Sequence, residues 1–315
     1  MSDKNDIMLS IYVATYNHEN YIVRALDSIL MQKTKYNFEV LVGEDCSTDS
    51  TRSVLKEYEK QHPNKFQIFY REKNMYNEKC NNVQDLKLRC KGKYKIALEG
   101  DDFWTDENKI EKQIDFLESH PEYIAVAHNC VVVDENSKPN GEIYPQCTDE
   151  EYTTMHFFCD ILPGQLTTVM YRDYMQDDEF DSSILEKGLT PDDRLLYFAL
   201  LCHGKIFCMQ ETMSAYRHIT THGSSFSANY KFDFFYQKKW QQEFIEYVKK
   251  NSGKKELKIS EYQYLYFIVK GLLSKQITFR QAVQEYFTIR HKIAVILIAF
   301  KRIINKKILH KKIYT

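Results

Sequence analysis

The sequence predicts an α/β fold in which helices cover both faces of a mostly parallel sheet. Over residues 8–120, short apolar runs alternate with segments whose apolar residues recur at helical spacing. This alternation is typical of parallel strands, because the crossover that joins two of them usually carries a helix. Polar loops rich in Asp, Asn and Ser follow three of the runs. Since open α/β sheets bind ligands at the carboxyl ends of their strands, we expect these loops to meet at one edge.

The first half of the chain repeats a strand, loop and helix unit. The expected strands are the apolar runs at residues 8–14, 38–42, 66–70 and 94–98. The expected helices are the amphipathic segments near residues 21–30, 54–58 and 83–89, and one that begins near Lys109.

The second half is predicted to add strands and then to become helical. The expected strands are residues 124–133, 166–171, a short one around Ile206 and 213–217. Residues 134–163 carry Pro, Gly and Cys without periodicity, which indicates loops over the ligand-binding edge. A helix is expected to open at 190–193. From about Asn229 the chain is poor in Gly and Pro and predicts three or four helices, so we divide it into residues 7–226 and a helical region, 227–315.

Composition narrows the class of protein. The 315 residues carry a formal net charge of -1, so we expect no nucleic-acid partner. Eight cysteines without a Cys-x-x-Cys pair indicate reduced thiols, and the polar segment 1–6 lacks the apolar core of a secretory signal. No run reaches the roughly 18 apolar residues that a membrane span needs. We therefore expect a cytoplasmic location.

An acidic cluster follows the fourth strand: Glu99, Asp101, Asp102 and Asp106 lie within eight residues. Carboxylates at this density repel one another unless a cation offsets their charge. Oxygen ligands at a strand end suit Mg²⁺ or Mn²⁺, which are usually shared with the phosphates of a substrate. The alternative is a solvated acidic turn that caps the helix beginning near Lys109.

The last predicted helix, from Arg290 to about Leu309, is basic and amphipathic. Its apolar residues recur at helical spacing, whereas residues 290–315 hold eight Lys or Arg and no Asp or Glu. Such a helix can lie on an anionic membrane, here the inner face of the cell membrane. It can equally pack on the main domain or on a second copy in a homo-oligomer, and the sequence leaves these alternatives open.

Three motifs in register carry a resemblance to a known family. They are Ser10–Asn17, Val42–Asp49 and Leu98–Trp104, and each follows a predicted strand. In this order and spacing they resemble family 2 glycosyltransferases with the GT-A fold, above all those that build bacterial surface polysaccharides and glycans. The resemblance covers residues 7–226 and implies a GT-A, Rossmann-like mixed sheet with a C-terminal helical appendage.

The resemblance also implies the reaction. Its members transfer a sugar, here a hexosyl or N-acetylhexosaminyl group, from a nucleotide-sugar donor, most often a UDP-sugar, to a hydroxyl of a glycan, glycolipid or glycoprotein. Attack assisted by one base implies inversion at the anomeric carbon. Processive members carry a Gln-x-x-Arg-Trp block, but Gln237–Trp240 lacks its Arg, so we expect one sugar added per encounter.

Donor-binding residues follow from the motif positions. Asp102 is the expected ligand of Mn²⁺ or Mg²⁺ with Asp101 beside it, and Glu99 would hold the ribose or a metal-bound water. Asp45 is expected to accept from the uracil imide N–H with help from Glu44, unless both only cap the next helix. The expected wall of the base and nucleotide site consists of Thr15, Tyr16, Asn17, Arg71 and Asn82, although Asn17 can alternatively close a turn.

Acceptor activation and closure of the site are assigned further along the chain. Asp193 is the favoured catalytic base, with Asp192 beside it; a helix N-terminus keeps a carboxylate ionised, although a simple helix charge would use the same place. Arg217 is expected at the pyrophosphate. His218 or His222 is expected to join the metal, and His222 is preferred because Gly and two Ser follow it.

Two other functions are considered. Nucleotidyl transfer needs a Gly-rich loop with Lys after the first strand, which Thr15–Asn17 does not offer. A catalytically inactive scaffold would bind sugar nucleotides, or a membrane or sister subunit, without turnover.

Overall fold

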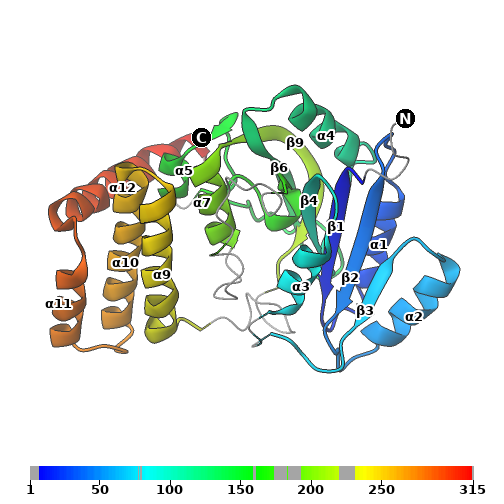
Figure 1. The fold of residues 1–315 in the computed structure, drawn as a ribbon, viewed down its shortest axis with the longest axis horizontal. Helices are drawn as coiled ribbons and strands as arrows, with labels where there is room; N and C mark the ends of the chain where they lie inside the picture. Colours follow the sequence, from blue (N-terminus) through cyan, green and yellow to red (C-terminus); the bar gives the residue numbers. More distant parts are fainter. Residues whose placement is uncertain are drawn as a thin grey trace.

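The computed structural model describes residues 7–76, 78, 80–158, 161–173, 183, 193–219 and 231–313. Figure 1 shows a sheet with its helices on one side of the molecule and a stack of C-terminal helices on the other. Among the described residues, nine strands form one mixed sheet. Eight of them run in the order β3-β2-β1-β4-β8-β6-β9-β5, and β7 pairs with β9.

The parallel half of the sheet follows the predicted units. Its strands are β1 (Leu9–Thr15), β2 (Phe38–Glu44), β3 (Gln67–Tyr70) and β4 (Tyr94–Glu99). Its helices are α1 (Ile22–Leu30), α2 (Thr51–Gln61), α3 (Asn82–Arg89) and α4 (Lys109–Ser119). The pairs β1·β2, β1·β4 and β2·β3 are all parallel, which confirms the prediction.

Alternating side chains place helices on both faces of the sheet. Leu9, Ile11 and Val13 of β1 are buried against α1, α2 and α4, whereas Tyr12 faces α3. Because successive strand residues point to opposite faces, one apolar strand supplies both cores.

The mixed half departs from the predictions in three places. It contains β5 (Phe103–Trp104), β6 (Tyr123–Val133), β7 (Glu151–Tyr152), β8 (Met170–Arg172) and β9 (Lys205–Arg217), with the helices α5 (Thr154–Phe158) and α7 (Asp193–His203). The two strands expected around Ile206 and at 213–217 are one strand, β9. This strand pairs in parallel with β6. Shifts in the register of the pair accommodate the polar residues that separate the two expected strands.

The strand expected at 166–171 is wrong in its first half, which is the 3₁₀ turn η1 (Leu166–Thr168). The side chain of Gln165 accepts the backbone N–H and the hydroxyl of Thr167, and the Thr168 hydroxyl donates to the Gln165 carbonyl. These local hydrogen bonds compete with strand pairing, so only Met170–Arg172 joins the sheet. The segment 134–163, predicted as loops, also contains β7 and α5.

A buried cluster joins α4 to η1 and β6. Lys109 lies in the core with its Nζ 4.1 Å from the centre of the Trp104 ring and donates to Gln113 at 2.7 Å. Gln113 donates to the carbonyls of Val126 and Thr168, and Trp104 donates to that of Thr167. Burial lowers the pKa of Lys109 well below its ordinary value. The cluster fixes the segment that follows the acidic loop.

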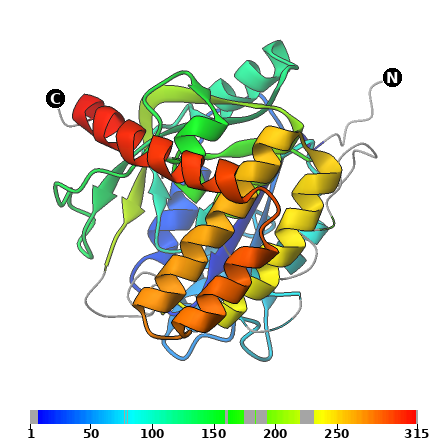
Figure 2. The same cartoon turned by 90° about the vertical axis from the view of Figure 1, so that its left-hand side faces the viewer.

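The C-terminal region consists of four helices within the described residues, as predicted. They are α9 (Phe234–Asn251), α10 (Lys254–Leu273), α11 (Phe279–Thr288) and α12 (Lys292–Ile313). They share a core with α7 and β9, for example through Phe198 and Phe244, whose ring centres are 5.3 Å apart. Figure 2 shows α12, in red, running at a steep angle to α10, against which its first part packs. The predicted domain boundary near Phe226 lies outside the described residues and stays a prediction.

No helix in the described part of the chain is both long enough and apolar enough to span a membrane.

His128 of β6 predicts a pH dependence of stability. It is fully buried, its Nε2 has no partner among the described groups, and burial lowers its pKa well below 6.5, assisted by Lys109. Below about pH 6.5 the unfolded chain takes up a proton there that the folded chain does not. The free energy of unfolding therefore falls as pH falls, with a limiting slope for this group of about 1.4 kcal/mol per pH unit. His128→Gln is expected to flatten the slope measured by urea unfolding between pH 7 and 5. Equal slopes for both proteins would contradict the assignment.

Candidate functional site

The loops predicted to converge do meet at one edge of the sheet. Thr15 at the end of β1 is in register with Glu44 at the end of β2, and Ala14 is in register with Glu99 at the end of β4. The backbone N–H of Asp45 donates to the Thr15 carbonyl and that of Gly100 to the Ala14 carbonyl. Thr15, Glu44, Asp45, Glu99 and the acidic loop therefore share one rim.

Asp102 is the most deeply placed residue of the acidic loop. Its side chain is 1% exposed, and its Oδ1 accepts the backbone N–H of Arg217 at 2.7 Å. Its own N–H donates to the Glu99 carbonyl, closing the turn. Burial raises the pKa of Asp102 well above its ordinary value, and the neighbouring carboxylates Asp101 and Glu99 raise it further. This site therefore favours positive charge nearby.

Gln165 bridges two of the carboxylates. Its Nε2 donates to Glu99 Oε2 at 3.0 Å and to Asp102 Oδ2 at 3.1 Å, while its Oε1 accepts from Thr167. The side-chain amide cannot flip without losing these contacts, because two groups of Thr167 donate to its oxygen. Gln165 thus keeps Glu99 and Asp102 side by side against their repulsion.

Arg217 holds the acidic loop from the end of β9. Its Nε donates to the Asp101 carbonyl, and its terminal nitrogens donate to the Asp134 carbonyl and to Ser137 Oγ. The guanidinium also lies 4.2 Å from the centre of the Tyr21 ring. It was expected at the pyrophosphate; the structure places it under the loop, buried, with these partners.

Asp101 is a partly exposed carboxylate of the acidic cluster and, unlike Asp106, is not paired with a lysine in the described structure. Its side chain is 20% exposed, and Oδ2 lies 3.7 Å from Nε2 of His18. The other ring nitrogen of His18 is 3.2 Å from Thr15 Oγ1. A Cβ at Gly100 would stand 2.7 Å from this ring, so only glycine lets the loop approach so closely. The β1 loop and the acidic loop therefore meet at His18 and Asp101.

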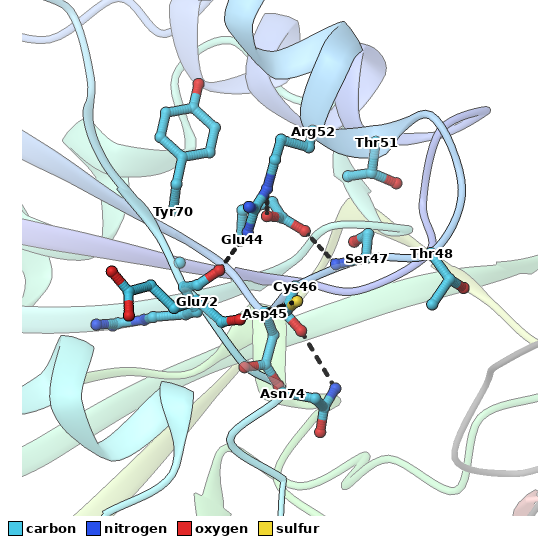
Figure 3. Close-up of polar contacts among 12 residues, drawn as sticks. Glu44, Asp45, Cys46, Ser47, Thr48, Thr51, Arg52, Tyr70, Glu72 and Asn74 are labelled. Carbon is cyan, nitrogen blue, oxygen red and sulfur yellow. Dashed lines mark hydrogen bonds and ion pairs between the residues drawn. The ribbon is translucent and has the colours of Figure 1, made fainter.

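The tip of β2 contains a second carboxylate that is already paired. Figure 3 shows Glu44 between Ser47, whose N–H donates to it at 2.6 Å, and Arg52, whose Nε donates at 2.5 Å. Glu44 is fully buried. It ties the loop to α2 through the side chain of Arg52.

Asp45 is buried at the end of β2, 7% exposed, beside the segment that follows β3. Its Oδ1 accepts the Met75 N–H at 2.8 Å, and Asn74 donates to its carbonyl. Burial raises the pKa of Asp45, although the Met75 N–H and the Arg71 charge oppose the rise. An open groove of about 700 Å³ is lined by this segment, including Tyr70, Arg71, Met75 and Cys80.

Arg71 and Asn82 support the floor of this region. Arg71 donates to Asn82 at 3.0 Å and pairs with Asp85 at 2.5 Å, and Asn82 donates to the Gly43 carbonyl at 2.8 Å. A Cβ at Gly43 would stand 2.2 Å from Asn82 Oδ1, so the two elements are in direct contact.

Tyr16 and Asn17 form the turn after β1. Asn17 has φ 57°, and its Oδ1 accepts the Thr48 N–H, so it joins the β1 and β2 loops. Tyr16 is half-buried beside it.

The acceptor and closure residues are only partly described. Asp193 is the first residue of α7, and Asp192 and His222 lie outside the described residues. His218 lies just after β9, where its Nδ1 is 2.5 Å from Glu142 Oε2.

The donor set fits a cation that is shared with a substrate. No three His, Cys, Asp or Glu side chains of the described chain lie close enough to hold a metal ion by themselves. Asp101 offers an accessible oxygen beside two further carboxylates, Glu99 and Asp102. One or two carboxylates with substrate phosphates as the remaining ligands suit Mg²⁺ or Mn²⁺.

A family model described as glycosyl transferase family 2 matches residues 10–169, about half of the chain. The chain belongs to this family. An uncharacterised protein of Mycobacterium tuberculosis is 30% identical over 213 residues, which are 66% of this chain and 58% of that protein. The putative teichuronic acid biosynthesis glycosyltransferase TuaG of Bacillus subtilis is 33% identical over 110 residues, 35% of this chain and 42% of that protein. The chain thus spans 58% of the length of the mycobacterial relative.

A solved structure shares the fold. S. aureus TarS 1-349 in complex with UDP-GlcNAc superposes with a TM-score of 0.64 at 15% identity, covering 89% of this chain and 78% of that chain. The GT-A fold with C-terminal helices, expected from the sequence of this family 2 member, is confirmed.

Sequence reasoning missed Gln165 and His18. His18 follows Asn17 directly, so its place in the β1 loop was a usable signal. Gln165 had none, because its partners are set by η1, which was predicted as a strand.

Gln165 generates a prediction about the integrity of this family 2 site. Gln165→Leu leaves Glu99 and Asp102 without their shared donor and should lower the free energy of unfolding by about 1–3 kcal/mol. Gln165→Glu keeps the size of the side chain but adds a carboxylate. Its free energy of unfolding should therefore fall further below the wild-type value at pH 7 than at pH 5. Urea unfolding measures both, with the exposed Gln61→Leu as control. Unchanged stability in both variants would show that the bridge does not hold the loop.

Proposed function

We propose that the protein transfers one sugar per encounter from a UDP-sugar to a hydroxyl of a glycan, lipid-linked or glycoprotein acceptor, with inversion at the anomeric carbon. The observation that carries the proposal is the shared rim at the ends of β1, β2 and β4, which brings Thr15, Glu44 and Glu99 to one edge of the sheet. Family membership supports sugar transfer. TarS, which shares the fold, was solved with UDP-GlcNAc.

The region between the end of β2 and the segment that follows β3 is assigned to the base and ribose. Asp45 has one oxygen held by the Met75 N–H, which orients the carboxylate and leaves Oδ2 for an imide N–H. Thr15, Tyr16 and Asn17 form the adjacent wall. Glu44, Arg71 and Asn82 hold one another and the strand ends, so we assign them to shaping this wall.

The acidic loop is assigned to the cation and the diphosphate. We assign the ligand oxygen to Asp101 because it is accessible, and we assign Asp102 to positioning the loop because it is buried between Arg217 and Gln165. We assign Glu99 to the ribose or to a water of the cation. A bound Mn²⁺ or Mg²⁺ offsets the charge of the departing diphosphate. Arg217 is a positioning residue, and His218 or His222 can complete the ligand set.

Acceptor activation is assigned to Asp193, with Asp192 as its neighbour. A helix N-terminus favours the ionised carboxylate that a base requires. Asp193 removes the proton of the acceptor hydroxyl as the hydroxyl oxygen bonds to the anomeric carbon, and the bond to UDP breaks with the electron pair leaving on UDP.

The reaction is placed in the cytoplasm, where the free cysteines of the described chain stay reduced.

The ligand assignment predicts different effects for two adjacent carboxylates. Asp101→Asn should lower the Mn²⁺-dependent affinity for UDP at least about tenfold with unchanged thermal stability, since it removes the accessible charge. Asp102→Asn keeps the shape of the buried group and should change stability more than UDP affinity. Calorimetry with Mn²⁺ measures both variants. A larger affinity loss in Asp102→Asn would restore Asp102 as the ligand.

The reaction is tested on a panel of nucleotide sugars. Wild-type protein with Mn²⁺ should release UDP from one or a few UDP-sugars and release little from GDP-sugars. Asp193→Asn should bind the same donor with equal affinity and turn over about 10²- to 10⁴-fold more slowly with acceptor. No release from any donor, with or without crude acceptor, would favour a scaffold that binds without turnover.

A further inference from the structure

The α12 helix presents an apolar face that the fold does not cover. Its first half exposes five large apolar side chains at spacings of three and four residues, which places them on one face: Ile293, Ile296, Leu297, Phe300 and Ile303. Leu297 and Phe300 are each 64% exposed. At the end of α11, Phe287 is also exposed, and the Lys292 ammonium lies 5.8 Å from its ring centre. The apolar face therefore continues onto the end of α11.

The opposite side of α12 accounts for its attachment to the protein. Val295 is fully buried, and Ile298 and Ala299 pack against the same core as α10. His291, just before the helix, contacts Glu261 of α10 through its backbone N–H and its ring. The outward apolar residues are thus not needed to hold the helix in place.

Positive charge borders this face. Lys301 is exposed within the apolar stretch, and Arg290 is exposed just before the helix. Residues 290–315 contain eight Lys or Arg and no Asp or Glu. An apolar stripe bordered by basic residues matches the surface of an anionic bilayer, where acyl chains lie beneath negative headgroups.

We infer that the α12 face docks on an anionic membrane surface and lies in its plane. A second copy is the less suitable occupant, because a two-fold interface through α12 would bring two purely basic helices together. The membrane then concentrates the protein where amphipathic acceptors would be found. The inference rests on α11 and α12 alone and stands apart from the assignment of the donor site.

The test uses the full chain and sedimentation with vesicles. One set of vesicles is phosphatidylcholine, and the other is phosphatidylcholine mixed with phosphatidylglycerol in equal parts. The protein should sediment with the mixed vesicles, and raising the salt concentration should release it, because exposed charges are screened. Leu297→Glu combined with Phe300→Glu should weaken binding at least about tenfold. Lys301→Ala should weaken it about fivefold.

A matched control separates this face from general apolar exposure. Ile143 is 63% exposed on the loop after β6, and Ile143→Glu should bind the mixed vesicles like the wild type. Binding that is equal in both vesicle types, or unaffected by the α12 variants, would overturn the inference. So would self-association in ultracentrifugation without vesicles that Leu297→Glu abolishes. UDP affinity, measured in solution on the same samples, reports separately on the proposed donor site.

Discussion

The site depends on the burial of one carboxylate. Asp102 lies in the interior with an N–H from the end of β9 on one oxygen and the Gln165 amide on the other. These two donors join the acidic loop to segments far away in the sequence, so the loop cannot move without disturbing β9 and η1. Burial and two neighbouring carboxylates oppose the ionisation of Asp102. A positive charge beside the loop would therefore stabilise the ionised carboxylates. A cation at the partly exposed Asp101 would supply that charge.

The other carboxylates near the rim differ in whether protein groups already neutralise them. The buried Glu44 has its own donors, Ser47 and Arg52, and the partly exposed Asp85 is paired with Arg71 and Arg89. Asp101, with His18 beside it, keeps 20% of its side chain exposed, whereas Asp45 is buried and bonded to the N–H of Met75, which lines the groove. A nucleoside diphosphate can contact both sites. Its charged diphosphate would lie at the acidic loop, and its base, which carries the hydrogen-bonding groups, would lie near Asp45.

Much of the fold could be predicted from the sequence because its signals are local. The alternating runs from Leu9 to Glu99 and the acidic, glycine-containing loop behind β4 have their meaning within a few residues. The pairing of a carboxylate, in contrast, cannot be read from its neighbours in the sequence. Glu44 and Asp101 both follow a predicted strand, and their roles differ because Arg52 and Ser47 donate hydrogen bonds to Glu44. The turn η1 was missed for a similar reason, because Leu166–Tyr171 has a strand-like composition and the side chain of Gln165 decides its conformation.

On this proposal, one ligand spans the rim from the end of β2 to the acidic loop, with a cation between its phosphates and Asp101. The most direct measurement is calorimetric titration of the unmodified protein with UDP and with uridine, each in Mn²⁺ and in EDTA. We expect Mn²⁺ to strengthen the binding of UDP at least about tenfold and to leave that of uridine unchanged, because only UDP brings phosphate oxygens to the cation. Equal UDP affinity in Mn²⁺ and EDTA, or the same gain for uridine, would contradict the account.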